Sequence, residues 1–219
     1  MEKDENALAQ GGMKFFGRMS ASATHEIKNI LAIINESAGL LEDLSVMAGK
    51  GHPLSFERTM DISQRVTRQV RRADLVVKKL NQLSHSVDHS MGLLDLEKTV
   101  CFVLDLGSRL VESQGACVKV TPPVSPIQVS SNLLYLENMI WRAIEAACRV
   151  AEGKKQIMVS FGSLSAVPSI WFSMDRVNNR LMDNLLESEE DRALMGHLRI
   201  SLEKNNEKNG FGLIWLKNI

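Results

Sequence analysis

Two long stretches of helical periodicity, separated by a short break, constrain this chain more than any other feature of its sequence. Apolar residues recur at spacings of three, four and seven over 13–47 and again over 55–89, as in helices that bury one stripe of side chains. Between the stretches, residues 48–53 contain glycines and a proline, which end a helix. The predicted stripe residues are Phe16, Ala23, Ile27, Ile30, Ile34, Leu41 and Leu44, followed by Ile62, Val66, Ala73, Val76, Leu80, Leu83 and Val87. The pattern predicts an antiparallel helical hairpin over residues 13–91.

A hairpin of this length cannot bury its own stripe, because each helix has only one neighbour. Pairing two hairpins into a four-helix bundle removes the exposed apolar band, so we expect a homodimer. Residues 1–12 are mostly polar and end in Gly11-Gly12, which predicts a frayed lead-in.

The remaining segment, 92–219, mixes helical and strand patterns and predicts a separate domain. Helices are expected over 93–115, 132–151 and 178–195, and strands over 116–120, 156–161, 169–174, 198–202 and 212–216. The fold class predicted for the whole chain is therefore α+β, with a helical bundle followed by an α/β sandwich domain.

Composition excludes several function classes. The chain has 219 residues with 26 basic and 26 acidic side chains, so no net field attracts nucleic acid or an anionic membrane. Its apolar runs are shorter than a membrane span. The three cysteines are widely spaced and form no Cys-x-x-Cys pair. We therefore expect a cytoplasmic protein with neither a nucleic-acid nor a membrane partner.

His25 is the candidate nucleophile of the first helix. It follows the stripe residue Ala23 by two positions, which places it at the flank of the bundle, within reach of solvent. A neutral imidazole is nucleophilic near neutral pH, which suits phosphoryl capture. We expect Glu26 to accept a hydrogen bond from one ring nitrogen. Asn29 lies one turn on and could orient a water molecule, and Lys28 adds positive charge.

Residues 22–31, with the core His25-Glu26-x-x-Asn29, resemble the phospho-acceptor box of two-component histidine kinases. The resemblance extends to the preceding residues Phe15, Phe16, Met19 and Ser20, to the hairpin and to the domain order. It implies that His25 is phosphorylated, that Glu26 assists the transfer and that Asn29 serves phosphatase activity. One departure is Ile30, where the family usually has proline.

The second segment resembles the kinase ATP-binding domain with its nucleotide site removed. Residues 138–146 are similar to the asparagine box, but Arg142 stands where that family has its Mg²⁺-binding asparagine, and a guanidinium cannot bind a cation. Asp175 follows a predicted strand without the glycines that accompany it in the family. Gly210-Phe211-Gly212 faintly resembles a glycine-rich lid box, but residues 196–216 fit better as the two terminal strands of that family, with a polar turn over 203–210. The resemblance therefore implies a degenerate domain that needs no cofactor and no metal.

Together these features predict a histidine phosphotransferase of the dimeric hairpin type, which passes phosphoryl groups between the aspartates of response-regulator receiver domains. Mg²⁺ is expected only in the partner receiver. Lys28, Arg68, Arg71 and Arg72 are candidate docking residues, with Arg68, Arg71 and Arg72 expected a few turns from His25 toward the hairpin turn. A solvated basic helix face explains the arginines equally well.

Two other functions remain open: a receiver phosphatase that uses Glu26 and Asn29, and a non-catalytic pseudokinase that binds a receiver or a sensor kinase. His85 and His89 have the spacing of metal ligands on one helix face, but no third ligand is evident.

Overall fold

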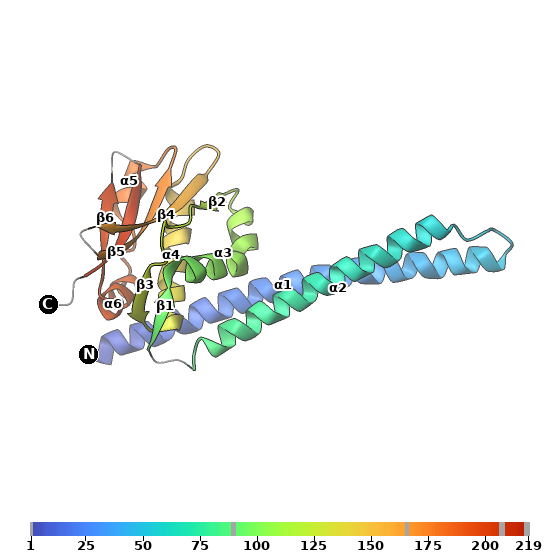
Figure 1. Cartoon of the computed structure of the whole chain (residues 1–219), viewed down its shortest axis with the longest axis horizontal. Coiled ribbons are helices and arrows are strands. Elements are labelled where there is room, and N and C mark those ends of the chain that lie inside the picture. Colours follow the sequence, from blue (N-terminus) through green and yellow to red (C-terminus); the bar gives the residue numbers. More distant parts are fainter. Residues whose placement is uncertain (1, 89–90, 165–166, 206–208, 217–219) are drawn as a thin grey trace. The chain divides into compact units, whose positions relative to one another are not determined.

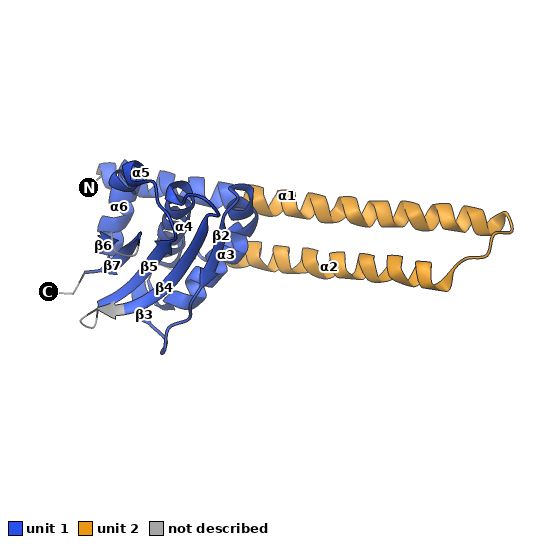
Figure 2. Cartoon of the chain, turned by 90° about the horizontal axis from the view of Figure 1, so that it is seen from above, with its two compact units in different colours: residues 1–19, 83–219 blue, residues 20–82 orange. Residues whose placement is uncertain are grey.

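The computed structural model describes residues 2–88, 91–164, 167–205 and 209–216. It divides the chain into two compact units, shown in Figure 2. One unit contains Ser20–Gln82, and the other contains Met1–Met19 together with Leu83–Ile219. The chain is α+β, with long helices at its N-terminus followed by mixed helices and strands (Figure 1). None of the described helices is long and apolar enough to cross a membrane.

The hairpin unit consists of parts of α1 (Glu2–Gly49) and α2 (Phe56–His85), joined by a short connection. Its core is the predicted apolar stripe. The side chains of Ala23, Ile30 and Val76 are buried, and those of Ile27, Ile34, Ala73 and Leu80 pack around them in a half-buried layer. The periodicity therefore predicted correctly which faces of the two helices meet.

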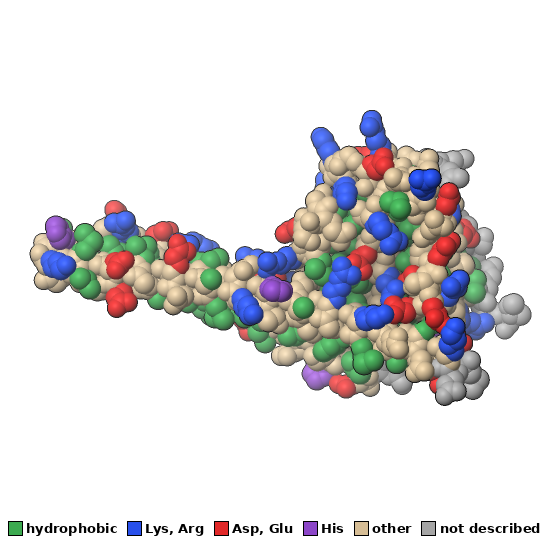
Figure 3. All heavy atoms as spheres, turned by 180° about the vertical axis from the view of Figure 1, so that it is seen from behind, with side chains coloured by type: hydrophobic (Ala, Val, Ile, Leu, Met, Phe, Trp, Pro, Cys, Tyr) green, Lys and Arg blue, Asp and Glu red, His purple; other side chains and the backbone are tan. Residues whose placement is uncertain are grey.

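Cross-helix ion pairs flank this core. The Nη2 atom of Arg65 lies 2.9 Å from Glu36 Oε2, and Arg72 contacts Glu26. Other apolar side chains of the hairpin face solvent, and Figure 3 shows hydrophobic groups along the face in view. Leu31, Val70 and Leu75 are each more than half exposed.

The other unit is built on a five-stranded sheet with the order β2-β4-β5-β7-β6. Its strands are β2 (Cys117–Val120), β4 (Gln156–Leu164), β5 (Val167–Met174), β6 (Ile200–Asn205) and β7 (Gly210–Trp215). Only the pair β2 and β4 is parallel. Helices α3 (Leu96–Ser113) and α4 (Leu133–Val150) pack against each other and against the sheet, with α6 (Glu189–Leu198) beside α4. This arrangement is the predicted α/β sandwich.

Two short strands of this unit were not predicted. β1 (Gly92–Asp95) pairs antiparallel with β3 (Gln128–Ser131), so the helix predicted from residue 93 begins only at Leu96. The Asp95 side chain caps that helix by accepting a hydrogen bond from the Lys98 amide. Isolated segments of four residues are too short for periodicity to reveal.

The single helix predicted over 178–195 is also wrong. The structure has α5 (Asn179–Asp183) and α6, each with its own N-cap, Asn178 and Ser188. Leu186 between them adopts a positive φ of 51°, which no helix continues through.

The prediction of a frayed segment over residues 1–12 is wrong as well. Helix α1 begins at Glu2, and its first turns belong to the sheet-containing unit, so the boundary predicted at residue 13 does not hold. Ala7 and Leu8 are buried there. Gly11 and Gly12 lower helix propensity by about 1 kcal/mol each. Gly11 and Gly12 are buried, and a Cβ on Gly12 would lie 3.7 Å from Leu134 of α4, in ordinary contact. Tertiary packing therefore overrides the local preference.

Candidate functional site

His25 is exposed on α1, as its position in the sequence predicted. The preceding Ser22 and Ala23 are buried, Ala23 within the core between the two helices, and this turns the imidazole outward. Within the described part of the chain, the His25 ring makes no hydrogen bond or ion pair. Both ring nitrogens are thus accessible to a partner molecule.

Glu26 does not bind the His25 ring as expected. The Arg72 Nε atom donates a hydrogen bond of 3.0 Å to Glu26 Oε1, and Arg72 Nη2 lies 2.9 Å from the same oxygen. Adjacent side chains on a helix diverge by about 100°, whereas a residue beside the interface faces the other helix. The opposite helix therefore determines the orientation of Glu26.

This contact also corrects the expected position of Arg72. The sequence predicts Arg72 a few turns from His25, toward the hairpin turn. In the structure its guanidinium pairs with Glu26, the residue that follows His25. Lys28, Asn29, Arg68 and Arg71 are exposed. Their roles in transfer, hydrolysis and docking stay predictions.

Arg142, at the metal position of the asparagine-box resemblance, is held by acidic side chains of α6. Its Nη1 atom donates a hydrogen bond of 2.7 Å to Asp191 Oδ1, and its Nη2 atom contacts Glu190 Oε2. Arg142 Nε donates to Asn138 Oδ1 at 3.3 Å. All three charged side chains are largely buried. A cation placed at this position would lie against a fixed guanidinium, which would repel it.

The N-terminus of α6 is occupied by the protein's own acidic groups. Ser188 and Asp191 form a reciprocal capping box, and the first turn contains Glu189, Glu190 and Asp191. A helix N-terminus with free amides attracts phosphate groups. Here the carboxylates already satisfy that preference, and a nucleotide phosphate would be repelled by them.

The first turns of α1 cover this region of α4 and α6, which the sequence analysis missed. Lys14 pairs with Glu190, and this contact is the largest cause of the lowered pKa of Glu190. Arg18 pairs with Glu145 and lies 5.7 Å from the centre of the Trp141 ring. The basic residues Lys14 and Arg18 are one helical turn apart on one face. That spacing was the only sequence signal for this contact.

Gly210-Phe211-Gly212 lies in β7, which begins at Gly210 and not at residue 212 as predicted, and its glycines are required by the neighbouring strand β5. A Cβ on Gly210 would lie 2.2 Å from the Phe172 carbonyl oxygen, and one on Gly212 would lie 2.7 Å from the Trp171 ring. Both glycines therefore serve strand packing and do not belong to a phosphate-binding loop.

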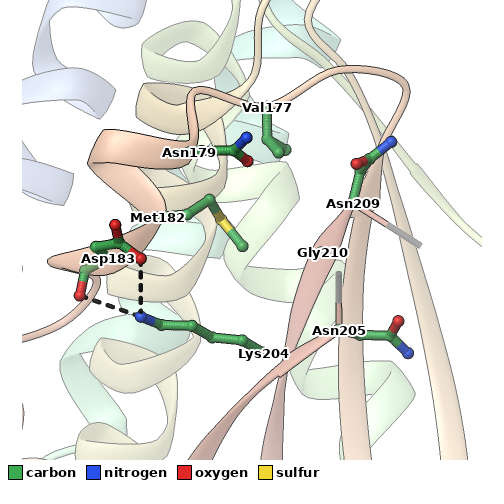
Figure 4. Close-up of a pocket in the computed structure, with 8 residues that line it drawn as sticks. All are labelled: Val177, Asn179, Met182, Asp183, Lys204, Asn205, Asn209 and Gly210. Atoms are coloured by element: carbon green, nitrogen blue, oxygen red, sulfur yellow. Dashed lines mark hydrogen bonds and ion pairs between the residues drawn. The ribbon is translucent and has the colours of Figure 1, made fainter. Parts of the chain in front are cut away.

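A polar cavity of about 380 Å³ is lined by the segment 177–183 and by the adjoining ends of β6 and β7 (Figure 4). Side-chain amides of Asn179, Asn205 and Asn209 line it. Lys204, which also lines the cavity, donates a hydrogen bond of 3.1 Å from Nζ to the Asp183 carbonyl oxygen. The Asn209 amide donates to the Asp175 carbonyl oxygen at 3.2 Å. These internal contacts already engage the Lys204 ammonium group and the Asn209 amide, which a ligand in the cavity would need.

The described residues contain no group of three metal-binding side chains. His85 Nδ1 lies 3.0 Å from Asp88 Oδ2, and the predicted second ligand, His89, lies outside the described residues.

Glu137 is a buried carboxyl group that the sequence analysis did not single out. Its Oε1 atom accepts a hydrogen bond of 3.1 Å from Ser86 Oγ, and its Oε2 atom is buried without a partner among the described residues. Burial raises the pKa of Glu137 to about 8, against a smaller lowering by the Ser86 hydroxyl. The residues on either side of Glu137 in the sequence did not indicate that its side chain is buried.

No family model and no curated protein matches this sequence. Among solved structures, the chain is similar to histidine kinase AdeS of Acinetobacter baumannii, with a TM-score of 0.48 and 15% identity over 89% of this chain and 98% of that chain. It is also similar to the cytoplasmic segment of histidine kinase QseC, with a TM-score of 0.44 and 14% identity over 68% and 95% of the two chains. The catalytic domain of histidine kinase ThkA gives a TM-score of 0.43 and 12% identity over 57% and 93%. Similarities of this size carry no functional argument, which rests instead on the side chains described above.

Proposed function

We propose that this chain is a histidine phosphotransferase of a phosphorelay, which acts through His25 and does not use ATP. One observation carries the proposal: an exposed histidine in a phospho-acceptor-like sequence coexists with an asparagine-box helix whose metal position is Arg142, ion-paired to Glu190 and Asp191. A protein built in this way can receive a phosphoryl group but has no described means of taking one from a nucleotide.

The transfer needs little from this chain. A neutral His25 nitrogen attacks the phosphorus of an aspartyl phosphate on the receiver, a nitrogen–phosphorus bond forms, and the phosphorus–oxygen bond breaks with its electrons remaining on the aspartate. The reverse reaction passes the group to a second receiver. Mg²⁺ in the receiver stabilises the developing charge.

Exposed basic residues favour docking of an acidic receiver surface. Lys28 lies within one turn of His25, and Arg68 and Arg71 are exposed on α2. Complementary charge increases the association rate more than the affinity. Arg72 has a different role in this proposal, because its guanidinium holds Glu26.

Homodimerisation is part of the proposal. Leu31, Val70 and Leu75 leave apolar side chains of the hairpin in water, and a second hairpin packed on them would complete a four-helix bundle. Sedimentation analysis is expected to give a dimer at micromolar concentration. A stable monomer would contradict this part alone.

A phosphatase is the second candidate, because Asn29 is exposed one turn from His25. Its amide could position a water molecule for attack on a receiver's aspartyl phosphate. In that case Asn29→Ala is expected to lower hydrolysis while His25→Ala has the smaller effect. A non-catalytic pseudokinase would tolerate both substitutions.

The experiment that separates these functions follows labelled phosphoryl groups from a phosphorylated receiver. A phosphotransferase acquires acid-labile label that is absent from the His25→Ala variant. Loss of label as free phosphate indicates the phosphatase, and neither change indicates a binding protein. Tight binding of Mg²⁺-ATP with label on His25 would refute the proposed independence from ATP.

A further inference from the structure

The face of the five-stranded sheet that points away from the helices carries a tryptophan, Trp171 of β5. Successive residues of a strand point to opposite faces of the sheet. Ile170 and Phe172, on either side of Trp171, are buried, and Lys204, on the same face as Phe172, reaches Asp183 of α5. That face is therefore the one that the helices cover. Trp171 lies on the opposite, outer face, where its side chain is partly exposed.

Glycines on both neighbouring strands lie beneath the Trp171 ring. A Cβ on Gly212 of β7 would lie between 2.7 and 2.9 Å from three atoms of the six-membered ring, and one on Gly162 of β4 would lie 3.5 Å from the indole Nε1. Because three ring atoms are almost equally near, the ring turns its face, and not its edge, toward Gly212. The indole Nε1 donates a hydrogen bond of 3.0 Å to Ser169 Oγ, which fixes the orientation of the ring.

Covering a glycine on the adjacent strand accounts for only one face of the Trp171 ring. The residues directly opposite Trp171 on its two neighbouring strands are small, Ser160 on β4 and Gly212 on β7. Trp171 is accordingly not fully buried. An aromatic ring that is held in one orientation and remains accessible to solvent is a surface on which flat or cationic groups stack.

Glu203 of β6 places a negative charge beside this ring. It is the Cα partner of Gly212, so it lies on the outer face in the same cross-strand row as Trp171. Its side chain is exposed and makes no hydrogen bond or ion pair within the described part of the chain. The other charged strand residue on this face is Lys119 of β2, two strands away from β5. The charge next to Trp171 therefore disfavours a phosphate-bearing partner and favours a cationic one.

An arginine side chain has the chemistry that this surface fits. Its planar guanidinium stacks on an aromatic face and pairs with a carboxylate through two hydrogen bonds. Two strand spacings put the backbones of Trp171 and Glu203 about 10 Å apart, and the indole extends over Gly212 between them. One guanidinium can therefore contact both side chains. We propose that the outer face of the sheet binds a partner protein through an arginine that stacks on Trp171 and pairs with Glu203.

A short peptide with one arginine, acetyl-Gly-Gly-Arg-Gly-Gly-amide, tests the proposal. It is titrated into the full chain, and the indole N–H signal of Trp171 is followed by NMR. The other two tryptophans, Trp141 and Trp215, are buried, and the spectrum of the Trp171→Phe variant identifies the signal of Trp171. The matched control peptide carries citrulline in place of arginine, which keeps the planar group and removes its charge.

The arginine peptide is expected to shift the Trp171 signal saturably, and the citrulline peptide to bind about tenfold more weakly, because it loses both the cation–π contact and the ion pair. Glu203→Gln is expected to weaken binding of the arginine peptide about threefold, as for an exposed ion pair. Glu187→Gln, at an exposed position outside the sheet, is expected to bind as the wild type does. Circular dichroism confirms that each variant folds.

Four results would overturn the proposal. The arginine peptide would produce no saturable shift, the citrulline peptide would bind equally well, or Glu203→Gln would leave the affinity unchanged. Alternatively, maltose would shift the Trp171 signal at lower concentration than the arginine peptide does, which would assign the surface to a carbohydrate. Phosphoryl transfer through His25 is measured separately and does not involve this surface, so either conclusion can fail without the other.

Discussion

Replacing Glu137 by glutamine is expected to change how the stability of the sheet-containing unit depends on pH. The Glu137 side chain is 1% exposed, and its two oxygens differ: one accepts from Ser86 Oγ, and the other is buried without a partner among the described residues. No charged side chain contributes to the raised pKa of Glu137, whose causes are burial and the Ser86 hydroxyl. The group therefore favours its protonated form in the folded protein.

The sign and size follow from the two pKa values. The carboxyl group ionises near 4.5 in the unfolded chain and near 8 in the folded protein, so the folded state binds the proton more tightly. Its contribution is fully present below pH 4.5 and is lost as the pH rises toward 8. At 1.36 kcal/mol per unit, the free energy of unfolding falls by about 5 kcal/mol across this window. Glutamine keeps an acceptor for Ser86 but cannot ionise, so the variant lacks this loss.

Urea unfolding from pH 4 to pH 9, followed by tryptophan fluorescence, measures the effect, because Trp141, Trp171 and Trp215 all lie in the same unit as Glu137. The difference between Glu137→Gln and the wild type is expected to grow in favour of the variant as the pH rises. Glu112→Gln, at an exposed position of α3, is the matched control and is expected to follow the wild type. Parallel pH profiles for Glu137→Gln and the wild type would refute the reasoning.

Two further predictions concern packing and surface charge. Gly107→Ala would place a Cβ 2.2 Å from the buried Trp141 ring and is expected to destabilise the protein by roughly 1–3 kcal/mol; a melting temperature equal to that of Gly17→Ala would contradict this. A double-mutant cycle with Glu26→Gln and Arg72→Ala is expected to give a coupling of only about 0.2–1 kcal/mol, because the Arg72 side chain is 58% exposed. A coupling above about 2 kcal/mol would mean that the pair is buried by a second chain.

The sequence could predict the elements that repeat a pattern over many residues. The stripe from Ala23 to Ile34 and its partner around Val76 identified the hairpin and its core, since helical spacing translates directly into a buried face. The same spacing placed His25 outside that face. The last strand was also predicted, although it begins at Gly210 and not at residue 212, while β1 and β3 were missed because strands of four residues have no measurable period.

Contacts between segments that are distant in sequence could not be predicted from these patterns. Glu26 was expected to accept a hydrogen bond from the His25 ring but is instead bound by Arg72. The Arg72 guanidinium faces Glu26 from the opposite helix, whereas the His25 side chain points in another direction. The sequence shows a positively charged side chain at Arg142, but its partners Glu190 and Asp191 could not be predicted from it. Pairings of single charges leave no periodic signal.

The sequence by itself determined the paired helices, the outward position of His25 and the presence of an arginine at position 142. These depend on residue type and on helical geometry, which act locally along the chain. The tertiary structure alone decided that α1 continues back to Glu2 and covers α4. Gly11 and Gly12 disfavour a helix on their own, and the burial of Ala7, Leu8 and Phe15 against the rest of this unit offsets that local cost.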